Sequence, residues 1–412
     1  MNNYINLLKK SIKHKDGTTL TNLLTLENFR PSYDLEQQIR LNPGIINSID
    51  RQIEPPWDLV VSSHLSSYQA IIEYPSDYSK AFNIRCSLVQ HLNRVMVALK
   101  DQNWMMPIVC ENAKELRKMA AFLDVKCENL NKGKNWFSEE AANQLMNIFR
   151  TCTSDIRSNI EVSKRRSIMN LSNNLIQIYF KICKLNLCKP LMRAIENAKI
   201  DNHFTLAERV TYAFLCGKKM LFDAEYSKAE ESLQFAYRMC DFRKKKNLRL
   251  ILTYLIPVKM YFGKMPTSAL MKGHNLEIFE TFSRAIKTGD IYLYDEELKN
   301  KHYDLLERGL HVLFIRLERL VYRTLVKKIY HFQNSHQIDV ELLTRAFNFS
   351  KSNRNQIRLE EEDQFTLSEV QLLVATFIYN KIIKGYISLE HRKLVISKQT
   401  PFPLLHTSKF DL

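Results

Sequence analysis

The histidines are the side chains in this sequence best suited to bind a metal ion, and their spacing is poor for that purpose. His302 and His311 are nine residues apart, and His331 and His336 are five apart across an expected helix end. A zinc site needs closely spaced pairs of ligands that converge on one point. The pattern therefore predicts no metal site, and nothing else in the sequence calls for a cofactor.

Phosphate-binding and acid–base motifs are also missing from the sequence. The Gly-Lys pairs at Gly133, Gly217 and Gly263 lack the upstream glycine and the following Ser or Thr of a phosphate-binding loop. The longest run of adjacent carboxylates is in "LEEEDQ", which is typical of a solvated connection. A catalytic acid and base would have to come from distant segments. We therefore expect a protein that is not an enzyme.

The cysteines are spread singly along the chain, without a Cys-x-x-Cys pair. This spacing fits neither a zinc site nor a disulfide scaffold, so we expect reduced and mostly buried thiols. They are Cys86, Cys110, Cys127, Cys152, Cys183, Cys188, Cys216 and Cys240.

The remaining candidate activity is binding of a polyanion by lysine and arginine side chains. The net charge is +16 and the isoelectric point is near 9.3, so a nucleic acid or an acidic partner is plausible. Three groups of cations are candidates to bind nucleic acid by their phosphates, which would give binding without sequence preference. A C-terminal group comprises Lys381, Lys384, Arg392, Lys393 and Lys398; a helical row comprises Arg316, Arg319, Arg323 and Lys327; a secondary basic patch comprises Arg243, Lys244, Lys245, Lys246 and Arg249. For the row and the patch, an ordinary solvated surface is the alternative.

The C-terminal cations need a hairpin to position them. Two β-prone arms, residues 386–389 and 394–397, flank the turn "EHRK". The helix before them opens with Thr366 and Glu369 in capping-box spacing, and Gly385 falls where its C-cap is expected. Its apolar residues predict a helix buried almost all round, and core packing is the favoured role of Tyr386. The order helix, helix, helix, hairpin predicts a winged helix over residues 308–403.

The rest of the chain is expected to be all-α. Its 412 residues are 45% hydrophobic and contain few glycines and prolines, which disfavours sheet-rich folds. Residues 56–307 predict a solenoid of tetratricopeptide-like hairpins, with Gly217 and Ala229 at a close helix crossing. Residues 1–55 are poorly defined. Without a signal peptide or a membrane span, a soluble intracellular protein with no membrane insertion is expected.

Several long segments of the sequence resemble one known family. They are "EPPWDLVVSSHL", "LCKPLMRAIE", "AERVTYAFLCGKKMLFDAEYSKAEESL", "LIPVKMYFGKMPT", "VYRTLVKKIY" and "KGYISLEHRKLVISKQTPFP". In that order they resemble the PCI-domain proteins of the nuclear-pore mRNA export complex, also called the transcription-and-export complex. The resemblance extends from about Glu54 to the end of the chain.

The resemblance implies a scaffold subunit in the nucleus, at the nuclear pore periphery, with the cytoplasm as an additional location. Its winged helix would lie beside that of a large PCI-type scaffold protein. A small acidic protein shared with the proteasome lid would brace the pair, and together they would bind RNA without sequence preference. A PCI subunit of a proteasome-lid-like or signalosome-like complex, with protein contacts only, is the alternative.

Overall fold

The computed structural model describes residues 2–26, 52–74, 77–99, 102–126, 133–155, 159–352 and 364–405, with residues 37, 39, 40 and 157 besides. Most of the described residues are helical, as the sequence predicts. The chain divides into two compact units, Met1–Leu215 and Cys216–Leu412. The division at residues 55 and 307 inferred from the sequence is a different partition and stays a prediction. None of the described helices is long and apolar enough to cross a membrane.

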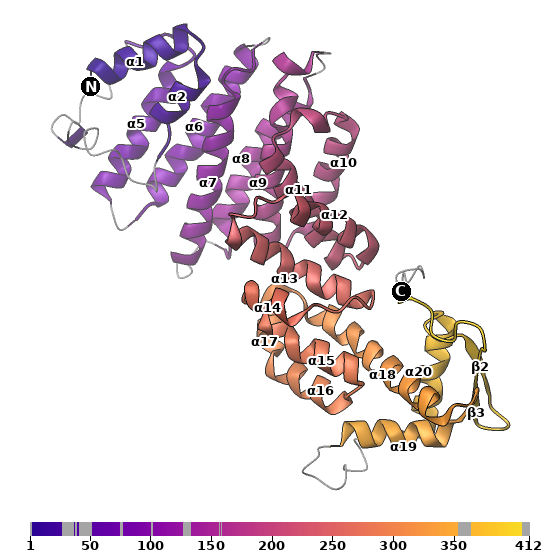
Figure 1. Cartoon of the computed structure of the whole chain (residues 1–412). Coiled ribbons are helices and arrows are strands. Elements are labelled where there is room, and N and C mark those ends of the chain that lie inside the picture. Colours follow the sequence, from indigo (N-terminus) through magenta and orange to yellow (C-terminus); the bar gives the residue numbers. More distant parts are fainter. Residues whose placement is uncertain are drawn as a thin grey trace. The chain divides into compact units, whose positions relative to one another are not determined.

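The first unit contains a row of antiparallel helices, α5 to α10, in which each helix packs on the next along the chain (Figure 1). The small N-terminal helix α2 packs on α7. Such neighbour-on-neighbour packing is how a helical repeat buries its apolar faces. The helices are α1 (Asn2–Lys13), α2 (Gly17–Leu23), α5 (Asp58–Glu73), α6 (Ser79–Ala98), α7 (Met106–Lys126), α8 (Trp136–Thr153), α9 (Ile168–Lys181) and α10 (Cys188–Ala198); α11 (Leu206–Phe222) continues into the second unit.

A buried ion pair lies inside the first unit. The Arg85 guanidinium on α6 contacts the Glu115 carboxylate on α7 and donates a 2.7 Å hydrogen bond to the Asn112 side chain. The other Glu115 oxygen accepts a 2.6 Å hydrogen bond from the backbone N–H of Leu26. The pair therefore fixes the segment after α2 to the helical core, and both partners have the hydrogen bonds that burial demands.

The second unit begins with a helix crossing that the sequence indicated. A Cβ atom on Gly217 of α11 would stand 2.7 Å from Cγ of Leu233 on α12. Leu233 and Ala229 are completely buried. Only glycine permits this approach, and the predicted close crossing is confirmed. The following helices are α12 (Tyr226–Met239), α13 (Lys245–Tyr261), α14 (Ser268–Gly273), α15 (Glu280–Thr288), α16 (Ile291–Asn300) and α17 (His302–Arg308).

A winged helix completes the second unit (Figure 1). The long helix α18 packs on α13, α15 and α16 through a buried stripe that includes Leu313, Leu317 and Val321. Three strands form an antiparallel sheet in the order β1-β3-β2. The elements are α18 (His311–Gln333), β1 (Gln337–Asp339), α19 (Val340–Lys351), α20 (Leu367–Tyr379), β2 (Gly385–Ser388) and β3 (Lys393–Ile396).

The start of α20 is as the sequence predicts, and its end is not. Thr366 and Glu369 form a complete capping box. The helix ends at Tyr379, and Gly385 is the first residue of β2 rather than a helix cap. A Cβ on Gly385 would stand 2.2 Å from the carbonyl oxygen of Val395, so this glycine is needed for close strand pairing.

The described cysteines carry no disulfide. Cys86, Cys152, Cys188 and Cys216 are buried, whereas Cys183 is exposed. Burial raises the pKa of the Cys86 thiol to about 12, which makes it an unreactive core residue. The predicted thiol at Cys127 lies outside the described residues.

Candidate nucleic-acid and partner interface

Two cations of the C-terminal group lie at the tip of the hairpin. Strands β2 and β3 are joined by a turn in which Arg392 adopts a positive φ of 50° and donates its N–H to the Leu389 carbonyl. The Arg392 side chain is exposed, and its Nη1 lies 3.4 Å from Oε1 of Glu341. Lys393 is half-buried beside it. A surface ion pair this long contributes little, so Arg392 remains available to a phosphate.

The other three cations lie at the open end of the hairpin. Lys381, Lys384 and Lys398 are all exposed. The Ser397 N–H donates a 2.8 Å hydrogen bond to the Lys384 carbonyl, which brings Lys398 next to Lys384. The Lys384 ammonium donates a 2.8 Å hydrogen bond to Oγ1 of Thr400.

The structure thus separates the C-terminal group into two clusters. Lys384 directly precedes β2. Ser388, which pairs with Lys393, lies four residues further along the same strand. At a strand rise of about 3.3 Å per residue, the clusters are about 13 Å apart. A single strand of nucleic acid is long enough to contact both.

The helical row on α18 does not form an open cationic face. Arg316 donates a 3.0 Å hydrogen bond to the Tyr226 hydroxyl, and the Arg319 guanidinium lies 4.1 Å from the centre of the Tyr261 ring. Both arginines are half-buried, and only Lys327 of the row is exposed. Cation–aromatic contacts of this kind stabilise the packing of α18 on α12 and α13. Phosphate binding by the row stays a prediction.

Arg323, the remaining residue of the row, is hydrogen-bonded to the segments on both sides of the wing, which is the hairpin of β2 and β3. Its Nη2 donates a 2.8 Å hydrogen bond to the Pro403 carbonyl, and its Nε donates a 3.3 Å hydrogen bond to the Ile382 carbonyl. Its guanidinium lies 5.7 Å from the centre of the Phe402 ring. Burial lowers the pKa of Arg323, but an arginine still carries its charge at neutral pH. The side chain therefore joins α18 to the segments before and after the hairpin.

The secondary basic patch is a separate surface at the start of α13. Lys244, Lys245, Lys246 and Arg249 are exposed there, and Arg243 forms a 3.2 Å ion pair with Asp241. The patch is carried by α13 and the turn before it, whereas the wing is the hairpin of β2 and β3. Both belong to the second unit.

The expectation that α20 is buried almost all round is wrong for one of its faces. Leu372 is 69% exposed and Tyr379 is 83% exposed, whereas Val370, Val374 and Phe377 are buried on the opposite face. The two exposed residues are seven apart, which places them on one side of the helix. This spacing was readable in the sequence and was overlooked.

An exposed aromatic also marks the wing. Tyr386 is 62% exposed, so the core-packing interpretation of it is wrong. Strand β2 lies at the edge of the sheet and presents one face to solvent. In the sequence, Tyr379 precedes Lys381 and Lys384, and Tyr386 follows them.

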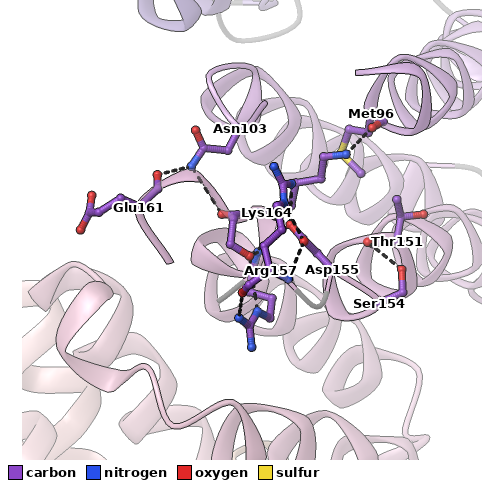
Figure 2. A network of polar contacts seen from close by, with 10 residues as sticks. Met96, Asn103, Thr151, Ser154, Asp155, Arg157, Glu161 and Lys164 are labelled. Atoms are coloured by element: carbon purple, nitrogen blue, oxygen red, sulfur yellow. Dashed lines mark hydrogen bonds and ion pairs between the residues drawn. The ribbon is translucent and has the colours of Figure 1, made fainter. Parts of the chain in front are cut away.

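The first unit contains an open pocket of about 380 Å³, lined by both polar and apolar side chains. Its wall includes Glu161, whose carboxylate lies 3.3 Å from Arg166 and 3.4 Å from His203. Asn103 donates hydrogen bonds to the carbonyls of Glu161 and Ser163 (Figure 2). In the described part of the pocket wall, Asn103 therefore fixes a chain connection, and the Glu161 carboxylate is shared between Arg166 and His203.

The connection itself is organised around Asp155 (Figure 2). The Asp155 carboxylate accepts hydrogen bonds from the Arg157 side chain and from the backbone N–H of Lys164, 2.8 Å long. Burial acts to raise the pKa of Asp155, but these hydrogen bonds outweigh it and hold the pKa well below its ordinary value. The Lys164 ammonium hydrogen-bonds the Met96 carbonyl. Among the described side chains, no cluster of three His, Cys, Asp or Glu is placed to hold a metal ion.

Comparison with known proteins agrees with the fold. The profile of a family described as "PCI domain" matches residues 299–398. The chain is 35% identical to "PCI domain-containing protein 2 homolog" of Drosophila melanogaster and to "PCI domain-containing protein 2" of Danio rerio, each over 98% of both chains. It is 28% identical to "Protein CSN12 homolog" of Mycosarcoma maydis, over 95% of this chain and 92% of the relative. None of these names describes an enzyme.

The profile covers α18, the three strands and most of the winged helix, and the full-length relatives extend the match over both units. This chain belongs to the family of the PCI domain-containing protein 2 homologues.

Proposed function

We propose that this chain is a non-enzymatic scaffold and RNA-binding subunit of the nuclear-pore-associated mRNA export complex. Its winged helix would pair with the winged helix of a large PCI-type scaffold protein, braced by a small acidic protein shared with the proteasome lid. The chain would act in the nucleus, at the periphery of the nuclear pore. Family membership and a fold of stacked helices, which offers surfaces for partners, support this proposal.

The observation that carries the RNA part is the set of exposed cations at the wing. Lys381, Lys384 and Lys398 are exposed at its open end and Arg392 at its tip. Contacts from lysine and arginine to phosphate give affinity without sequence preference. Leu372 and Tyr379 occupy part of the exposed face of α20, which leaves fewer positions there for polar side chains that could read base edges.

Affinity purification of the full chain, followed by identification of the co-purifying proteins, tests the assembly. The proposal expects a large PCI-type export scaffold among them. Recovery of proteasome-lid or signalosome subunits without that scaffold would contradict it.

A binding measurement tests the RNA assignment. Single-stranded RNA is titrated with the chain together with its scaffold partner, over a range of salt concentrations. In the variant Arg392→Glu with Lys393→Glu, we expect weaker binding to every sequence and a salt slope lower by about 1.4, since each lost contact to a single strand removes about 0.7. The matched control reverses two exposed lysines of the same unit, Lys272→Glu with Lys287→Glu.

A wing that only contacts protein is the second candidate function. It is favoured by the exposed apolar face of α20, since Leu372 and Tyr379 would be buried by a protein partner. If the wing variant leaves RNA affinity and salt slope unchanged but loses the partner, this second function holds and the RNA assignment of the wing is wrong.

A further inference from the structure

The turn between α12 and α13 displays an aromatic ring, Phe242, directly before the first residue of the secondary basic patch. Asp241 to Lys244 form a tight turn, closed by a 2.9 Å hydrogen bond from the Lys244 N–H to the Asp241 carbonyl. Phe242 is the second residue of this turn and is 79% exposed. Most of the ring is therefore in water and is accessible to a ligand.

The turn is held in one conformation by its own polar contacts. The Asp241 carboxylate accepts a 3.0 Å hydrogen bond from the Arg243 N–H and a 3.2 Å hydrogen bond from Nε of the same arginine. The Arg243 guanidinium lies 6.0 Å from the centre of the Phe242 ring. These contacts fix the residues on both sides of Phe242, so the ring is presented by a structured turn.

Further cations follow this ring along the chain. Lys245, Lys246 and Arg249 are exposed on the first turns of α13, and no acidic side chain of the described residues forms an ion pair with them. Lys245 and Arg249 are four residues apart and Lys246 and Arg249 three apart, so all three lie on one side of the helix. An uncompensated cationic face next to an exposed ring has the two elements of a surface that binds single-stranded nucleic acid.

We propose that Phe242 and the cations Lys245, Lys246 and Arg249 form a second RNA-binding surface, which stacks one unpaired base and binds the adjoining phosphates. Single-stranded nucleic acid fits because a base can stack on an exposed ring without a groove, while phosphates follow the cations. A duplex does not fit, because its bases are already stacked. The surface rests on residues of α13 and the turn before it, and it does not depend on the wing.

Fluorescence anisotropy of the full chain with labelled oligouridine tests the stacking. From the strength of base–aromatic stacking, we expect Phe242→Ala to lower the affinity for oligouridine roughly 5- to 150-fold. Phe242→Trp should keep the affinity, and Phe242→Leu, which keeps apolar area but has no aromatic ring, should lose it. Since Phe242 is exposed, all three variants should unfold at the wild-type temperature.

The cations are tested by the double variant Lys245→Ala with Lys246→Ala. The salt slope of oligouridine binding should fall by about 1.4, as expected for two lost phosphate contacts to a single strand. The double variant Lys272→Ala with Lys287→Ala is the matched control and should keep the wild-type slope. Short-wavelength ultraviolet cross-linking of oligouridine should attach uridine to the peptide that contains Phe242.

Repeating the oligouridine titration with the scaffold partner present distinguishes this surface from the wing. If the Arg392→Glu and Lys393→Glu variant has no effect on RNA while Phe242→Ala weakens binding, the wing assignment fails and the second surface stands. Wild-type affinity of Phe242→Ala or of Phe242→Leu for oligouridine would overturn the second surface, as would no measurable binding by the wild-type chain. Loss of binding to phosphatidylserine vesicles or to oligoglutamate in Phe242→Ala, with oligouridine binding intact, would overturn it in favour of a membrane or an acidic peptide.

Discussion

The variant Gly217→Leu measures how closely α11 and α12 approach. A Cβ at residue 217 would stand 2.7 Å from Cγ of Leu233 and 3.2 Å from its backbone nitrogen. Carbon atoms normally stay about 3.5–4.0 Å apart, so the first added carbon already overlaps a buried side chain by about 1 Å. The backbone nitrogen of Leu233 cannot rotate away, and the leucine side chain adds three more carbons.

The expected loss in free energy of unfolding is the overpacking energy minus the free energy gained from the higher helix propensity of leucine. Overpacking costs about 1–3 kcal/mol, and replacing glycine within a helix returns somewhat less than 1 kcal/mol. Because the overlap meets both the side chain and the backbone of Leu233, we expect Gly217→Leu to lower the free energy of unfolding by about 2 kcal/mol. For a unit of this size, that corresponds to a melting temperature lower by about 4–8 °C.

Thermal unfolding followed by circular dichroism is the assay, and Gly273→Leu is the matched control. Gly273 ends helix α14 and has open space around its Cβ position, so its substitution should change stability by less than about 0.5 kcal/mol. An unchanged melting temperature for Gly217→Leu, or an equal loss in both variants, would refute the proposed crossing. Adding Leu233→Ala to Gly217→Leu should restore part of the stability, because the new cavity accepts the added side chain.

Three further predictions follow from contacts described above. Gly385→Ala places a methyl group 2.2 Å from a carbonyl oxygen of β3, so hydrogen exchange should show faster exchange of the hairpin amides, and unchanged protection would contradict this. Glu115→Ala leaves the buried Arg85 without its carboxylate, and urea unfolding should show a loss of about 3–5 kcal/mol; a loss below 1 kcal/mol would mean that water reaches the guanidinium. The depressed pKa of Asp155 means that the unfolded chain binds a proton near pH 4 while the folded chain stays ionised. Its contribution is therefore present above pH 4 and lost as pH falls below that value, so Asp155→Asn should weaken the acid dependence of stability, and an identical pH profile would disprove the assignment.

The helices were predictable because their signals are local. The capping box of Thr366 and Glu369 is complete in the sequence itself. The arms of the hairpin were placed one residue too late, at 386–389 and 394–397 instead of Gly385–Ser388 and Lys393–Ile396. Strand β1 was missed because three residues carry no readable alternation, and it is a strand only because β3 offers it a free edge.

The environment of the candidate site residues was not predictable in the same way. Arginines three and four residues apart on α18 give the same sequence pattern whether they face solvent or protein. The Tyr226 hydroxyl that binds Arg316 lies 90 residues away in the sequence, and no local pattern reveals such a partner. Phe242 could have been recognised, since an aromatic residue next to four consecutive cations is readable in the sequence.

The attachment of the wing by Arg323 has an entropic consequence. The guanidinium binds the carbonyl of Ile382, before the hairpin, and that of Pro403, after it. Both roots of the hairpin are therefore anchored to α18 before any partner arrives. A ligand that binds a preorganised wing does not have to freeze a moving loop, so less of its interaction energy is lost to ordering. Removing the Arg323 side chain would weaken binding at the wing even for a ligand that Arg323 does not touch, because the free hairpin would gain conformational freedom that binding must then remove.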